Sequence, residues 1–217
     1  MFDILALVLI TVAFPVIVLV GYKCLKGGVD KTKAGKAFAL TLLFLELLRF
    51  FYNAKLYQGA ITPAVDLKYS YVTLLTVAAL FAAFHKGKFG ALCKNVTVLT
   101  CLVPLVIGIF NPAVYTNALD THAVIKGAYF VQSGVAVLLA ILFLDGVPSV
   151  LHTLIAFAFV LFYAFLNFLA NTYFKTGVAF DLGWFLQMGT AAVSCFVLYA
   201  VCFFVAKLSK KNTVKGE

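Results

Sequence analysis

Ala37–Tyr57, AFALTLLFLELLRFFYNAKLY, is the stretch that decides the fold. As a helix these 21 residues reach ~30 Å at ~1.5 Å per residue, about the thickness of a bilayer's hydrocarbon core. Glu46, Arg49 and Asn53 follow the spacing i, i+3, i+7 and therefore share one helix face. A lone charge there costs at least ~2.5–3.5 kcal/mol, so Glu46 and Arg49 are expected to pair or to face a wet cavity. Both an ion pair that locks neighbouring helices and a binding or catalytic site fit this pattern.

The composition excludes an ordinary soluble domain. Of 217 residues, 64% are hydrophobic and only 12% are charged, against about 45–50% apolar and about 25% charged in globular chains. Apolar runs of membrane-spanning length recur along the whole chain. They predict an all-α polytopic membrane protein, a bundle of seven helices, or six if the first is removed. The predicted spans are Phe2–Val20, Ala37–Tyr57, Leu67–Phe84, Ala91–Phe110, Ala123–Leu144, Val150–Tyr173 and Trp184–Ala206.

Basic residues fix the predicted orientation. The loop 23–36 holds five lysines against Asp30, and further lysines follow the third span and the seventh. With the N-terminus outside and the C-terminus cytoplasmic, twelve of the seventeen basic residues lie inside, which satisfies the positive-inside rule. The net charge of +9 thus indicates topology and attraction to anionic membrane lipids, and not nucleic-acid binding. We expect a multi-pass protein of the cell membrane, with one transmembrane domain over 1–206 and a basic cytoplasmic tail over 207–217.

The cysteines and motifs point to no cofactor. Five cysteines form no C-x-x-C pair, and no histidine stands beside them at metal-ligand spacing. Their odd number also argues against a disulfide framework. No G-x-S-x-G, H-E-x-x-H, P-loop or dinucleotide signature occurs. The sequence therefore predicts neither a metal nor a cofactor.

Polar residues concentrate in the predicted outer half of the bundle. Interhelical hydrogen bonds that serve only packing would be expected at all depths, so the uneven distribution predicts an outward-opening polar pocket with Glu46 and Arg49 at its floor. An arginine fork beside lysines suits a small anionic ligand, such as a phosphate, a carboxylate or a lipid headgroup. The predicted ligand-binding residues are Glu46, Arg49, Asn53, Lys68, Gln132, Asn167 and Asn171.

Three short motifs resemble the YwaF-like integral membrane proteins: ELLR at 46–49, NP at 111–112 and NFLANTYF at 167–174. Eukaryotic relatives of that family are described as phospholipid acyltransferases that use a membrane cysteine and histidine. The resemblance would match Glu46 and Arg49 to the family's polar pair. It would place the family's histidine and cysteine at Lys68 and Ser70, and a second histidine motif around Ser133. The chain departs from the family at these three positions, where it has neither cysteine nor histidine.

Three functions remain open from the sequence. The first is a binding or transport protein for a small anionic or lipid-headgroup ligand. The second is a lipid-modifying enzyme of the acyl-transfer kind, with Ser70, Lys68 or Ser133 as catalytic candidates, although the i, i+2 spacing of Lys68 and Ser70 puts them on different helix faces. The third is a membrane scaffold whose buried charges serve packing. Membrane lipids are the expected partners, and the sequence leaves partner subunits open.

Overall fold

The computed structural model describes residues 16, 19–23, 26–27, 30–56, 70–110, 123–174 and 182–214. All regular structure in these ranges is helical, which confirms the all-α prediction for this part of the chain. The predicted first span, Phe2–Val20, lies almost wholly outside the described residues. The helices are α2 (Lys31–Leu56), α4 (Ser70–Phe84), α5 (Lys88–Thr100), α6 (Val103–Phe110), α8 (Ala123–Phe143), α9 (Val150–Phe174) and α10 (Leu182–Val214).

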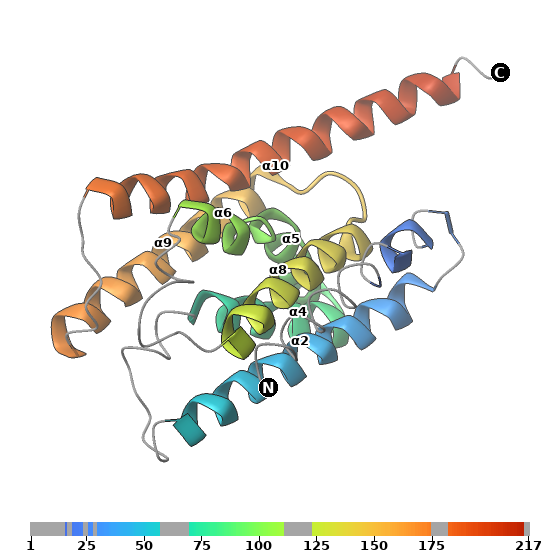
Figure 1. The fold of residues 1–217 in the computed structure, drawn as a ribbon. Helices are drawn as coiled ribbons and strands as arrows, with labels where there is room; N and C mark the ends of the chain where they lie inside the picture. The colour runs from blue at the N-terminus through green and yellow to red at the C-terminus, as the bar shows by residue number, and fades with distance from the viewer. Residues whose placement is uncertain are drawn as a thin grey trace.

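Helix α5 is the centre of the bundle. It packs against α4, α8, α9 and α10, while α2 packs on α4 and α8 at one side and α10 packs on α9 and α6 at the other (Figure 1). From Val96 to Thr100 every residue of α5 is buried, and Leu99 has no exposed surface. This position explains why α5 carries small and β-branched residues that allow four helices to approach it.

Side-chain hydrogen bonds cap the N-termini of two helices, α2 and α9. The Asp30 carboxylate accepts hydrogen bonds from the backbone N–H of Thr32 at 2.9 Å and of Lys33 at 3.2 Å, so α2 begins at Lys31, six residues before the predicted span. Ser149 caps α9 in the same way through the backbone N–H of His152 at 3.1 Å. At the other end of the chain α10 continues to Val214, so the basic tail begins inside this helix.

The predicted fourth span, Ala91–Phe110, is interrupted and forms α5 and α6, with a turn at residues 101–102. Pro104 follows the turn and has no N–H to donate to the carbonyl of Thr100, four residues earlier. The hydroxyl of Tyr71, from α4, donates to that carbonyl at 3.0 Å instead. Tyr71 is 1% exposed, so a side chain from another helix satisfies the backbone acceptor that the proline leaves behind.

Tyr71→Phe is expected to lower the free energy of unfolding by about 1–3 kcal/mol, because it leaves the buried Thr100 carbonyl without a donor. Equilibrium unfolding in detergent, followed by circular dichroism, measures this. The matched background is Pro104→Ala, which restores the missing N–H. In the Pro104→Ala background, Tyr71→Phe should lower the free energy of unfolding clearly less. An equal loss in both backgrounds would show that the Tyr71 hydroxyl does not take the place of the N–H that Pro104 lacks.

The outer surface of the described helices is strongly apolar. Phe44 and Phe51 on α2 are 63% and 67% exposed, Phe165 on α9 is 54% exposed and Phe204 on α10 is 61% exposed. Within the residues that the structure describes, two stretches are long and apolar enough to cross a membrane: Lys88–Val106, which runs through α5 into α6, and Val150–Leu169 in α9. By length and composition this is weak support for a membrane protein.

Candidate functional site

A cluster of four polar side chains, which we call the polar centre, lies where α2, α4 and α8 meet. It consists of Glu46 and Arg49 from α2, Thr73 from α4 and Gln132 from α8. The i, i+3 spacing brings the two charges together on one face of α2, as the sequence predicts. Arg49 Nε donates to Glu46 Oε2 at 3.2 Å, and Arg49 Nη2 donates to Glu46 Oε1. The pair is thus bidentate.

The other two side chains also converge on the carboxylate. Thr73 Oγ1 donates to Glu46 Oε1 and accepts from Arg49 Nη2 at 3.3 Å. Gln132 Nε2 donates to Glu46 Oε2 at 2.9 Å. Each carboxylate oxygen therefore accepts two hydrogen bonds, and one acidic group joins three helices.

Three of the four side chains of the polar centre are buried, and Thr73 is half-buried. Glu46 is 9% exposed, Arg49 4% and Gln132 1%. Its two charges compensate each other, which lowers the cost of placing them in an apolar bundle. One acceptor is left over: Gln132 Oε1 is buried and accepts no hydrogen bond from the described part of the chain. A buried acceptor without a donor is uncommon, so it needs an explanation.

The structure brings together three of the seven predicted ligand-binding residues, Glu46, Arg49 and Gln132. Asn167, on α9, is buried, and its amide donates to the carbonyl of Tyr163 in its own helix at 3.0 Å. No hydrogen bond joins Asn167 to the polar centre. The side chains of Asn53, Lys68 and Asn171 lie outside the described residues, so the outward pocket that they would line stays a prediction.

Of the three catalytic candidates, the structure describes the side chain of one. Ser133 lies beside Gln132 on α8 and is 1% exposed, whereas the side chains of Ser70 and Lys68 are outside the described part. Four cysteines are free and buried in the described ranges: Cys93, Cys101, Cys195 and Cys202. The described residues include no group of three histidine, cysteine or acidic side chains that could hold a metal.

Sequence analysis did not identify Thr73 as part of the site. Three other threonines of the bundle, Thr76, Thr97 and Thr100, donate to the carbonyl four residues earlier in their own helices. Thr73 instead donates to Glu46 across a helix interface. Thr73 could be identified only from its position opposite the Glu46 face of α2, and that position is known only once the packing of α2 against α4 is known.

Comparison with family models, with curated proteins and with solved structures finds no match to this chain. The resemblance to the YwaF-like proteins therefore stays a prediction.

Proposed function

We propose that the chain is a multi-pass protein of the cell membrane with seven spans, its N-terminus outside and its C-terminus in the cytoplasm. The exposed phenylalanines of α2, α9 and α10 support this, because monomeric soluble proteins rarely expose large contiguous apolar surfaces. In a bilayer the same side chains would face lipid. The all-helical architecture fits as well, since helices satisfy their own backbone hydrogen bonds.

The position of the lysines supports the orientation. One cavity is lined by the start of α2, the turn between α4 and α5 and the loop after α8, so these three segments meet at one end of the bundle. They carry Lys31, Lys33, Lys36, Lys86 and Lys88. We call this the lysine-rich end, and the positive-inside rule assigns it to the cytoplasm.

Within this architecture, the polar centre is proposed to bind a small anionic or lipid-headgroup ligand, for binding or for transport. The observation that carries this proposal is Gln132 Oε1, a buried acceptor next to the Glu46–Arg49 pair that receives no hydrogen bond from the described part of the chain. Arg49 can donate to an anion in place of one of its hydrogen bonds to Glu46. Gln132 Oε1 can accept a hydrogen bond from a hydroxyl of the same ligand. The predicted pocket would continue outward past Asn53 and Asn171.

The closed contacts favour a second candidate, in which the polar centre only locks α2, α4 and α8 together. Both oxygens of Glu46 are occupied by donors of the chain, and none of the four residues lines either of the two cavities of about 450 and 70 Å³ near the start of α2. The acyl-transfer alternative has less support, because Ser133 is buried in the bundle.

Native mass spectrometry with lipid identification on the purified protein tests the ligand. The wild type is expected to carry a defined anionic ligand that Arg49→Ala loses. The matched control is Leu99→Ala, which removes a fully buried side chain of α5, a helix that contributes no residue to the polar centre, and costs about 2–5 kcal/mol. Retention by this control would separate ligand binding from stability. The same unspecific bulk lipid on the wild type and on Arg49→Ala would leave the structural lock as the role of the polar centre.

A further inference from the structure

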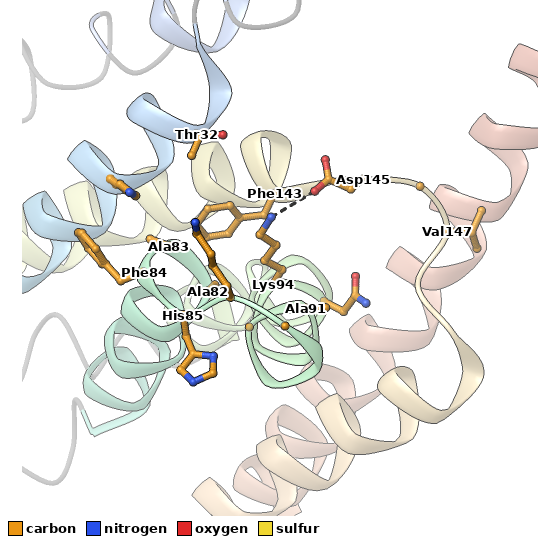
Figure 2. Close-up of a pocket in the computed structure, with 16 residues that line it drawn as sticks. Thr32, Ala82, Ala83, Phe84, His85, Ala91, Lys94, Phe143, Asp145 and Val147 are labelled. Atoms are coloured by element: carbon orange, nitrogen blue, oxygen red, sulfur yellow. Dashed lines mark hydrogen bonds and ion pairs between the residues drawn. The ribbon is translucent and has the colours of Figure 1, made fainter.

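A cavity of about 450 Å³ lies at the lysine-rich end, apart from the polar centre. Its walls come from the first turns of α2, the turn between α4 and α5, the start of α5 and the loop between α8 and α9. Figure 2 shows Lys94 and Asp145 facing each other beside Phe143, with His85 directed away from them. The volume is within the range of small-molecule sites, about 300–1,000 Å³.

The lining is basic. Three lysines line the cavity, Lys36, Lys86 and Lys94, together with one acidic residue, Asp145. Three positive charges and one negative charge leave an excess of two positive charges. Lys31 lines a smaller adjoining cavity of about 70 Å³ that shares Lys94 and Asp145 with the first. These lysines come from segments far apart in the sequence, so the fold gathers them.

Two of the lysines already have weak partners. Lys94 Nζ lies 3.3 Å from Asp145 Oδ2, and the side chains of this pair are 37% and 66% exposed. Exposed pairs of this kind contribute about 0–1 kcal/mol, so a stronger anion can replace the carboxylate. Lys36 Nζ lies over the ring of Phe84 at 5.6 Å, where the ring holds the ammonium without neutralising it.

We propose that this cavity binds a phosphate-bearing ligand, with Lys94, Lys36 and Lys86 as its counter-charges. A phosphate ester carries one to two negative charges, which matches the excess positive charge of the lining, and lysine ammonium groups bind phosphate as point charges. The apolar part of the wall, which includes Ala83, Phe84 and Phe143, would hold the carbon skeleton attached to the phosphate. A lipid headgroup and a soluble phosphoester share this chemistry. The site does not depend on the ligand proposed for the polar centre.

In this site Asp145 acts as an internal competitor. Its carboxylate occupies Lys94, so the phosphate must displace it before Lys94 can contribute. Asp145→Asn removes the competing charge and adds a donor, and it should therefore bind phosphate more tightly than the wild type.

The test uses the full chain in an uncharged detergent and titrates it with glycerol 3-phosphate and with inorganic phosphate in a calorimeter. In parallel, native mass spectrometry follows phosphatidylglycerol carried from nanodiscs that contain phosphatidylglycerol and phosphatidylcholine. Lys94→Met is expected to weaken binding by about tenfold, and Asp145→Asn to tighten it by a few-fold. The control is Lys33→Met, a lysine of the same end whose side chain is 87% exposed and does not line the cavity. It should change the affinity less than about twofold.

Retention of phosphatidylglycerol without binding of the soluble probes identifies a lipid headgroup, and the reverse identifies a soluble phosphoester. If Lys33→Met weakens binding as much as Lys94→Met, the attraction is that of a basic surface and the site is refuted. Absence of binding by the wild type and by Asp145→Asn to every probe refutes it as well. Lys86→Met provides a second lining variant in case Lys94→Met fails to fold.

Discussion

Glu46→Leu is expected to lower the free energy of unfolding by about 3–5 kcal/mol, because it leaves a buried guanidinium without its carboxylate. Arg49 is 4% exposed, and after the substitution Thr73 is the one side chain of the polar centre that still accepts from it. Arginine stays protonated in proteins, so it cannot escape the cost by becoming neutral. Equilibrium unfolding in detergent micelles, followed by circular dichroism, measures the loss.

The partner variant should behave differently. Arg49→Leu leaves Glu46 buried, and a carboxyl group can take up a proton and become neutral, so the cost should be smaller than for Glu46→Leu. The double variant Glu46→Leu/Arg49→Leu should recover most of the stability, since an apolar pair of similar size often replaces a buried ion pair at little cost. Phe44→Leu, at a 63% exposed position of the same helix, is the control. If Glu46→Leu costs no more than this control, the polar centre does not hold the three helices together.

The double variant also separates the two roles proposed for the polar centre. A stable double variant that no longer carries the ligand of the wild type would assign the charges to binding. A stable double variant with unchanged ligand content would show that they serve packing, as the closed contacts around Glu46 favour.

Local information was enough to predict part of this site. The pairing of Glu46 with Arg49 follows from their spacing within one helix, and it holds whatever surrounds that helix. Gln132 could be named because it lies with other polar residues in the predicted outer half of the bundle. Thr73 could not be named, because a helical threonine ordinarily bonds to its own backbone, as Thr76 does.

Contacts between segments far apart in the chain could not be predicted from the sequence. The helical run is interrupted next to Pro104, but nothing in the sequence indicated that Tyr71 would supply the missing donor. The lysine-rich loops predict the topology and an attraction to anionic membrane lipids, but not a cavity. The cavity beside them depends on how the start of α2, the turn between α4 and α5 and the loop after α8 are placed relative to one another. Asp145 there contacts a lysine that is 51 residues away in the chain.

Gly90→Ala is expected to be the most damaging small substitution, with a cost of about 3 kcal/mol, at the upper end of the range for overpacking. A Cβ atom at Gly90 would lie 2.0 Å from the carbonyl oxygen of His85 and 2.9 Å from its carbon. Both are backbone atoms of the turn between α4 and α5, so no side chain can rotate away and the turn itself must open.

The matched control for this substitution is Gly189→Ala in α10, where nothing lies within 4 Å of the added Cβ. Alanine should stabilise that helix by about 0.5–1 kcal/mol, since glycine is the poorer helix former. Unfolding of both variants in detergent gives the comparison, and similar stabilities would show that the turn can adapt. Because Gly90 and His85 both line the cavity at the lysine-rich end, Gly90→Ala should also weaken phosphate binding there, whereas Gly189→Ala should leave it unchanged. The close approach of α5 to this turn thus links the stability of the bundle to the shape of the proposed anion site.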